Sequence, residues 1–354
     1  MRSQVPGNTP AGLQPRRTLA VLVSILPVAA CEDLPLSQGD ENSIIVTVAP
    51  ELWEAVEASL VPALERTVFT VRDEKIFTVT SGELGGENWA LLRRLKRQLV
   101  LGTPADPWME RALAKVEEAV VPPQIAQVEN VWARGQVATR VILEEGSEVA
   151  GVTELLPSLA ELYDRQFRAR AVARMFVTDP DTVLSRQLAE DHGFTLLLPT
   201  VYRYETVDSV HIFRNDNPDP SELIRQFTVA WQSPPQEEFG VEDLLAWRAR
   251  IVDGYYNHPQ VVNLDRVIES RTVLHGNPAY TYQAIWENPP DEYPAAGPFI
   301  ARVVDCPDQG RRYLVDSWLY APGRDKYQYI IQLETILDSF RCSSPPAYIR
   351  REAG

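Results

Sequence analysis

Apolar and polar positions follow one another in short blocks along the chain, and their spacing predicts both strands and helices in its first half. Apolar runs rich in β-branched residues predict strands, at 43–48, 67–80, 97–101 and 136–143. Helical spacing of apolar residues predicts three helices, at 50–60, 107–119 and 154–193. The last of these stretches contains Asp179-Pro180, where we expect a break.

The second half repeats this mixture, beginning with a strand at 194–198. We expect a hairpin of 208–214 and 225–231, because residues 215–220 between them are dense in turn formers. The other apolar blocks predict strands at 271–286, with a break at Gly276-Asn277-Pro278, and at 299–304 and 312–320. They also predict helices at 241–255 and 325–340. The last helix has one apolar face, made of Ile330, Leu333, Ile336, Leu337 and Phe340. We expect this face to dock on the sheet that precedes it.

Strand groups joined by short turns, with helices between them, predict an α+β fold with antiparallel sheets covered by helices. Both halves mix strands and helices, which is the pattern of two similar α+β units in tandem, although their sequences are only weakly alike. We expect units at 43–192 and 193–342, and a tail at 343–354.

The first 30 residues have the pattern of a bacterial signal peptide. Arg2, Arg16 and Arg17 precede an apolar run that is too short to span a bilayer. The run ends in Val28-Ala29-Ala30-Cys31, which resembles the lipobox of bacterial lipoproteins. The resemblance implies cleavage before Cys31 and a diacylglycerol on its thiol. The alternative is a plain secretory signal with an incidental cysteine.

Residues 31–42 are polar and acidic, so we expect a tether between the lipid and the folded body. The sequence thus predicts an exported protein that is lipid-anchored to a bacterial envelope membrane, without fixing which membrane. The net charge is −15, and loss of the three signal arginines leaves −18. This charge argues against nucleic acid as a partner and leaves membrane attachment to the acyl chains. The densest basic cluster, 93–97, fits a solvated helix face.

Two further cysteines remain, Cys306 and Cys342. An even pair in an exported protein predicts a disulfide. Two buried free thiols are the alternative. Neither cysteine has a Cys or His neighbour at ligand spacing, so the sequence predicts no metal site.

No motif assigns a catalytic residue or a cofactor. The four histidines, at 192, 211, 258 and 275, have no metal-ligand spacing. The glycines of 82–86 lack the nucleotide-binding patterns, and there is no Gly-x-Ser-x-Gly sequence. A glycosidase pair cannot be selected among 49 acidic residues by spacing. We therefore expect a non-enzymatic binding or assembly module, with an envelope hydrolase acting on glycan or peptide as the alternative.

Aromatic residues are the strongest candidates for recognition. Tyr280, Tyr282 and Trp286 alternate on one strand face, where we expect them in the core. Tyr293 lies in the Pro-rich loop 287–298 and is expected to be exposed. Aromatic rings with polar tips are common in recognition sites. Tyr293, Trp318 and Tyr320 therefore form a candidate binding surface for an envelope protein or glycan.

Several short motifs of the mature chain resemble those of one family. They are Phe194-Thr195-Leu196 with Pro199, Gly297-Pro298-Phe299, Tyr320-Ala321-Pro322-Gly323 with Lys326, Gln332-Leu333-Glu334, and in the first half Trp53, Gln124 and Asn130-Val131-Trp132-Ala133. These are similar to the Bacteroidetes-type lipoproteins of domain of unknown function family 4837. That family has no assigned activity, so the resemblance implies no catalytic residue.

The end of the last predicted helix, Ser339-Phe340-Arg341, is distantly similar to PsbP-like domains. Those domains are mostly small binding or assembly modules. The resemblance therefore implies binding rather than catalysis.

Overall fold

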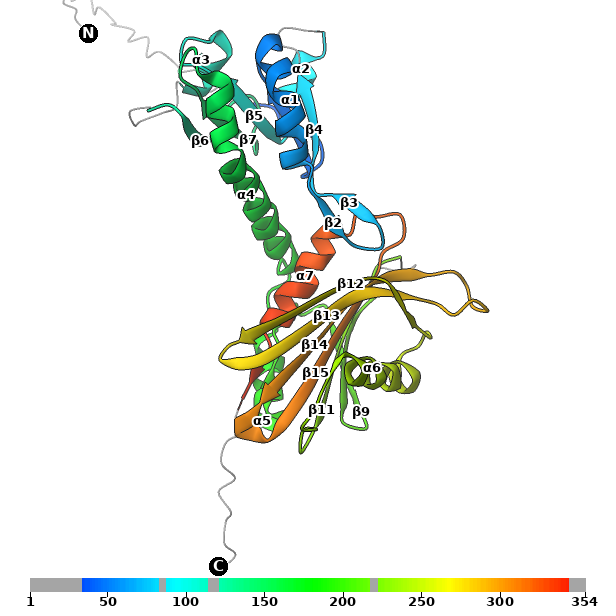
Figure 1. Ribbon diagram of the computed structural model, residues 1–354. Coiled ribbons are helices and arrows are strands. Elements are labelled where there is room, and N and C mark those ends of the chain that lie inside the picture. The colour runs from blue at the N-terminus through cyan, green and yellow to red at the C-terminus, as the bar shows by residue number, and fades with distance from the viewer. Residues whose placement is uncertain (1–33, 83–86, 114–120, 217–221, 344–354) are drawn as a thin grey trace, which may run out of the picture. The chain divides into compact units, whose positions relative to one another are not determined.

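The computed structural model describes residues 34–82, 87–113, 121–216 and 222–343 (Figure 1). The predicted signal peptide, the predicted lipidation site Cys31 and residues 344–354 of the predicted tail lie outside these residues. None of the described helices combines the length and apolar character that crossing a bilayer requires. The predicted unit boundary at 192/193 stays a prediction.

The first sheet has five strands in the order β4–β1–β5–β7–β6. Their bounds are β1 Ser43–Thr47, β4 Thr78–Gly82, β5 Arg97–Gly102, β6 Gln124–Glu129 and β7 Val137–Ile142. β1 pairs in parallel with β4 and β5, and β5 pairs in parallel with β7. Only β6 runs antiparallel. The expectation of an antiparallel sheet is therefore wrong here, because the connections between β1, β4, β5 and β7 cross over and return in the same direction.

The helices of this half are α1 Pro50–Leu64, α2 Trp89–Leu92, α3 Pro107–Leu113 and α4 Glu148–Met175. Proline stands in the first turn of α1, where its missing N–H costs nothing. Val56, Leu60 and Leu64 then recur every four residues and are buried. They pack with β1, β5 and α4 in one apolar core. The predicted strand 67–80 is divided, because β2 Thr67–Phe69 and β3 Asp73–Lys75 form a separate hairpin.

The second sheet has seven strands, all antiparallel, in the order β12–β13–β14–β15–β11–β10–β9. Their bounds are β9 Arg203–Val207, β10 Val210–Asn215, β11 Ile224–Gln232, β12 Val261–Leu274, β13 Asn277–Glu287, β14 Ala296–Cys306 and β15 Arg311–Tyr320. The predicted hairpin of β10 and β11 is confirmed. The predicted stretch 271–286 contains the end of β12 and most of β13, which form a hairpin close to the predicted break. It turns at His275 and Gly276, which both have positive φ.

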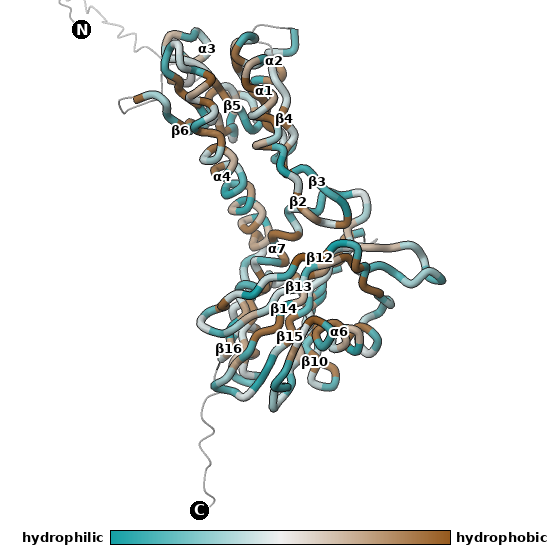
Figure 2. The backbone as a smooth tube through the Cα atoms, in the orientation of Figure 1, coloured by the Kyte–Doolittle hydropathy of each residue, from teal (hydrophilic) through white to brown (hydrophobic). Residues whose placement is uncertain are grey.

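Helices cover both faces of the second sheet (Figure 1). One face packs against α6 Val241–Tyr255, and the other against α5 Thr182–His192 and α7 Tyr327–Asp338. Apolar residues are concentrated along α7 (Figure 2). Leu333, Ile336 and Leu337 are fully buried, so the predicted docking of this helix is confirmed. The aromatic residues Tyr282 and Trp286 are core as expected, but they lie beneath α6. Tyr280 was also expected in the core and is only partly buried.

The break expected near Asp179-Pro180 separates α4 from α5. Asp181 caps α5 by accepting a hydrogen bond from the Leu184 N–H. The helix ends at His192, and Gly193 follows in the left-handed conformation, with φ of 81°. The chain then enters β8 Phe194–Thr195, which pairs with β16 Arg341–Cys342 near the end of the described chain.

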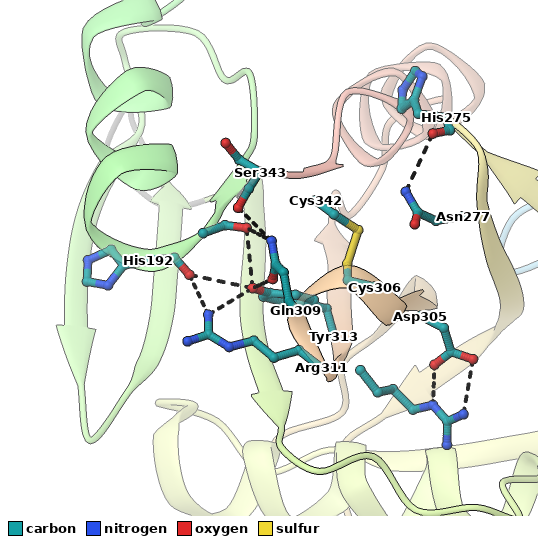
Figure 3. Close-up of a disulfide and its surroundings, with 12 residues drawn as sticks. His192, His275, Asn277, Asp305, Cys306, Gln309, Arg311, Tyr313, Cys342 and Ser343 are labelled. Atoms are coloured by element: carbon teal, nitrogen blue, oxygen red, sulfur yellow. Dashed lines mark hydrogen bonds and ion pairs between the residues drawn. A yellow bond between two sulfur atoms is a disulfide. The ribbon is translucent and has the colours of Figure 1, made fainter. Parts of the chain in front are cut away.

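Cys306 and Cys342 are joined as a disulfide between the end of β14 and β16, with 5.9 Å between their Cα atoms (Figure 3). Gln309 and Arg311 lie beside it. Gln309 Nε2 donates to the carbonyl oxygens of Gly193 and Ser343, and Arg311 Nη1 donates to that of His192. The end of α5, the disulfide and the β14–β15 turn are therefore held together.

The fold class is α+β, as predicted. The first sheet is mostly parallel and the second is antiparallel. The two halves are therefore not two similar units in tandem.

Candidate ligand-binding site

A pocket of about 280 Å³ lies over one end of the second sheet. Its walls come from three parts of the chain, and the lining residues are Ile224, Trp286, Trp318 and Tyr320 from strands, His258 and Pro259 from the loop after α6, and Asn288, Glu292, Tyr293 and Ala295 from the loop after β13. All three residues of the predicted binding surface, Tyr293, Trp318 and Tyr320, line this pocket. The structure thus places in one pocket three side chains that the sequence grouped only by residue type.

The floor of the pocket is aromatic because of strand geometry. Trp318 and Tyr320 are two positions apart on β15, so their side chains lie on the same face. Trp286 on β13 lies on that face too, and its ring centroid is 5.4 Å from that of Trp318 at an interplanar angle of 77°. Both tryptophans are nearly inaccessible to solvent. Tyr320 is half-buried, and Tyr293 at the rim is 77% exposed.

Gly297 allows Trp286 to occupy its place. These two residues are paired across β13 and β14. A Cβ on Gly297 would stand 2.8 Å from Trp286 Nε1 and 1.8 Å from the carbonyl oxygen of Leu319. In the space left by the missing side chain, the Trp286 indole N–H donates to that carbonyl oxygen at 3.2 Å. The glycine of the motif Gly297-Pro298-Phe299 therefore has a packing reason.

The loop after β13 folds back on itself through Asn288. Its backbone N–H donates to the carbonyl oxygen of Ala295 at 2.9 Å, and its side-chain Nδ2 donates to that of Tyr293 at 2.7 Å. These bonds hold the loop closed and place Tyr293 at the rim. They also fix the orientation of the Asn288 side-chain amide, and its Oδ1 atom accepts no hydrogen bond from the described residues.

Two buried polar atoms of the pocket-lining residues have no hydrogen-bond partner among the described residues. They are the donor Trp318 Nε1 and the acceptor Asn288 Oδ1. Most buried polar atoms in proteins are paired, because an unmade hydrogen bond costs about 1–3 kcal/mol. Both atoms are covered from solvent in this structure, so a molecule that enters the pocket reaches this unused donor and acceptor only when the side chains around them shift.

A buried ion pair holds the wall formed by the loop after α6. Arg248 on α6 and Asp316 on β15 are 1% and 0% exposed, and their Nε and Oδ1 atoms are 3.0 Å apart. Arg248 Nη2 also donates to Gln260 Oε1 at 2.6 Å, and the Tyr256 hydroxyl donates to Asp316 Oδ2 at 2.5 Å. The loop that carries His258 is thus fastened on both sides, at Tyr256 and at Gln260.

This network also sets the state of Tyr256. Burial raises its pKa well above the ordinary value, and the negative charge of Asp316 raises it further. The hydroxyl therefore stays protonated and remains a donor to Asp316. The Tyr256 ring packs 5.9 Å from that of Trp318, between centroids, so the network supports the pocket floor directly.

The titratable residues of the pocket lie at its exposed rim. His258 and Glu292 are both exposed, whereas the deep part is built from indole rings. No group of three His, Cys, Asp or Glu in the described part of the chain is placed to hold a metal ion. The arrangement suits a ligand that is neutral, partly apolar and able to form a few directed hydrogen bonds.

A second cluster, around His211, lies elsewhere on the sheet. His211 is fully buried, its ring is 4.3 Å from that of His192, and its Nδ1 is 2.9 Å from the Tyr204 hydroxyl. Burial, and then the neighbouring His192, lowers the pKa of His211 to about 4. No local pattern predicts this pairing, because the two residues are 19 positions apart and only the fold brings them together.

Comparison with known proteins places the pocket within a family segment. Residues 181–339 match the family described as domain of unknown function (DUF4837). No curated protein sequence matches the chain significantly.

Solved structures with a partly similar fold include the Saccharomyces cerevisiae Ran-binding protein Mog1p, with 8% identity and a TM-score of 0.28 over 42% of this chain and 90% of that chain. LpqN, involved in cell envelope biogenesis of Mycobacterium tuberculosis, has 15% identity and a TM-score of 0.29 over 44% and 87%. A Pseudomonas aeruginosa protein of unknown function, PA94, has 12% identity and a TM-score of 0.25 over 41% and 88%.

The family match begins at the N-cap of α5 and ends one residue after α7, so it contains every residue that lines the pocket. It also contains the motifs at 194–199, 297–299 and 320–323 that pointed to this family. Residues 181–339 thus resemble the family described as domain of unknown function DUF4837, as the sequence motifs indicated.

Proposed function

We propose that this chain is a lipid-anchored protein of the bacterial envelope whose C-terminal domain binds a neutral ligand in the aromatic pocket. The signal-peptide pattern and the cysteine at its end support export and anchoring. The pocket supports binding. Neither feature calls for a chemical step, so we propose a binding or assembly role.

The observation that carries the proposal is the pair of unused atoms, Trp318 Nε1 and Asn288 Oδ1. A ligand that displaces the side chains covering these two atoms, accepts from the indole and donates to the amide would satisfy both, while its carbon atoms contact the aromatic floor. The site is compact, and its floor strands β11, β13 and β15 are all inside the sheet. An extended peptide that binds by strand pairing needs a free edge, which these strands do not have.

An acetamido sugar has the required chemistry. Its amide carbonyl can accept a hydrogen bond, its N–H can donate one, and its methyl group and ring carbons can pack on aromatic side chains. We therefore propose that the ligand is an envelope glycan with N-acetylated units. Tyr293, exposed at the rim, is placed to contact a neighbouring unit.

Calorimetric titration of the full chain with N-acetylglucosamine and its β-1,4 disaccharide tests this proposal. Trp318→Phe keeps an aromatic ring and removes the donor, so we expect the dissociation constant to rise roughly ten-fold. Trp89→Phe, in the first half of the chain, is the matched control and should bind as the parent does.

Equal affinity of the Trp318→Phe and parent proteins would contradict the proposed site. Binding of a capped dipeptide in place of both sugars would show that the ligand is a peptide. Cleavage of the disaccharide would show that the chain is a hydrolase.

A further inference from the structure

The segment predicted as a tether is bound to the body from Pro35 onward. Backbone hydrogen bonds join Ser37 N–H to the Arg134 carbonyl and Gln38 N–H to the Arg94 carbonyl, each at 3.0 Å. The Arg134 N–H in turn donates to the Pro35 carbonyl at 2.7 Å. The segment therefore lies between the chain around 94–96 and the chain around 134, as two isolated β-bridges.

This attachment limits how far the body can lie from a lipid on Cys31. Only three Cα–Cα steps separate Cys31 from Leu34, and each step spans at most 3.8 Å. Whatever path residues 31–34 take, the lipid-bearing residue is within about 11 Å of Leu34. The proposed lipid anchor therefore holds the surface around Leu36 next to the bilayer.

The side chains on this surface are of two kinds that suit a membrane interface. Leu36 and Leu91 are large apolar residues that are 64% and 56% exposed. Arg93, Arg94 and Arg134 adjoin them along the chain or across the bridges, and none of the three guanidinium groups has a carboxylate partner within the described ranges. The neighbouring Lys96 differs, because it is paired with Glu41.

Leucine and arginine act on different layers of a bilayer. Exposed leucines enter the boundary between headgroups and acyl chains, and guanidinium groups bind phosphate oxygens in a bidentate way. Two exposed acidic residues nearby, Asp40 and Glu87, oppose a purely electrostatic attraction. The partner that fits this mixture is therefore a phospholipid surface, whose phosphates are present whatever its net charge.

We propose that Leu36, Leu91, Arg93, Arg94 and Arg134 form a membrane-docking surface that holds the first sheet against phospholipid headgroups. The proposal rests on the proposed lipid anchor at Cys31. It assigns a role to the basic cluster 93–97, which the sequence pattern alone assigns to a solvated helix face. The acyl chains then provide attachment, and the docking surface fixes orientation.

The full-length protein, purified with its lipid and reconstituted on vesicles of phosphatidylethanolamine and phosphatidylglycerol, provides the test. A polarity-sensitive fluorophore is attached to Leu91→Cys, the only free thiol when Cys31 is acylated and Cys306 and Cys342 are paired. Its emission should shift to the blue when vesicles are added. The matched control is Val273→Cys, which is 71% exposed on β12 and should show no shift.

Vesicle flotation separates the two claims. A protein that does not float with the vesicles contradicts the lipid anchor and, with it, the docking surface. A protein that floats but keeps an aqueous signal at position 91 contradicts the docking surface alone. In the triple variant Arg93→Gln, Arg94→Gln, Arg134→Gln, flotation and thermal unfolding should stay unchanged while the blue shift is lost. A full shift in that variant would overturn the proposed role of the arginines.

Discussion

Trp286 lies directly across the β13–β14 ladder from Gly297, and its indole N–H reaches over the glycine to the carbonyl oxygen of Leu319. This contact needs a position without a side chain, because a Cβ there would overlap the Leu319 carbonyl. The floor of the pocket thus depends on one glycine that does not itself line it.

Gly297→Ala should therefore destabilise the C-terminal domain. Backbone cannot move aside as a flexible side chain can, so we expect a loss of about 3 kcal/mol in the free energy of unfolding, as for overpacked cores. Urea unfolding followed by tryptophan fluorescence measures it. Gly254→Ala is the control, since nothing lies within 4 Å of a Cβ at this position in α6. There alanine should stabilise slightly, and an equal effect of the two changes would contradict the packing role of Gly297.

Removal of one partner from the Arg248–Asp316 pair should strongly lower the free energy of unfolding. Arg248→Met leaves Asp316 buried without its cation, for which we expect a loss of about 3–5 kcal/mol. The double variant Arg248→Met, Asp316→Leu should recover most of it, because no charge is then stranded. Arg250→Met, an exposed change on the same helix, should have little effect. A single variant as stable as the parent in chemical denaturation would show that the pair does not hold the α6 loop.

His211 should make the protein less stable in mild acid. Its folded-state pKa of about 4 is below the ordinary value of about 6.5, so between these values the unfolded chain binds more protons. The contribution of His211 to the free energy of unfolding is present above pH 6.5 and is lost as the pH falls toward 4. Between pH 7 and pH 5 we expect a loss of about 2 kcal/mol from this residue.

The measurement is the difference in unfolding free energy between the parent and His211→Gln at the two pH values. Glutamine does not titrate, so the effects of all other titrating groups are common to both proteins and cancel in the difference. An identical pH dependence of both proteins would contradict a buried neutral histidine.

Cys31→Ser tests the anchor itself. The variant lacks the thiol that we propose accepts diacylglycerol, so labelled palmitate should no longer be incorporated, and uncleaved precursor or a soluble product should accumulate. The measurement is fluorography of cells labelled with palmitate, with Cys306→Ser as the control that keeps the lipid. Label retained by the Cys31→Ser protein would refute the assignment.

Local signals predicted the helices and hairpins well. The predicted helix at 241–255 has the bounds of α6, and the apolar face of the last helix is buried as expected. β12 was predicted only in part, because most of its residues are exposed and give no alternating pattern. The parallel direction of the first sheet was missed, since direction depends on how crossovers pack and not on the pattern within a strand.

The residues of the candidate site were likewise predicted only where residue type alone was informative. Residue type alone grouped Tyr293, Trp318 and Tyr320, which do share the pocket. The Arg248–Asp316 pair spans 68 positions and has no local signal. Asn288 is one of many polar loop residues, and only the three-dimensional structure shows that its Oδ1 is buried without a partner.

The indole N–H of Trp318 gives the most direct test of the central claim that the pocket binds a ligand. In the ¹⁵N-labelled protein, Trp318→Phe assigns the indole resonance by its disappearance. Titration with the N-acetylglucosamine disaccharide should then move that resonance downfield, as expected when a free donor gains a hydrogen bond, while the indole resonance of Trp89 stays in place. A Trp318 resonance that does not respond at saturating disaccharide would contradict the account.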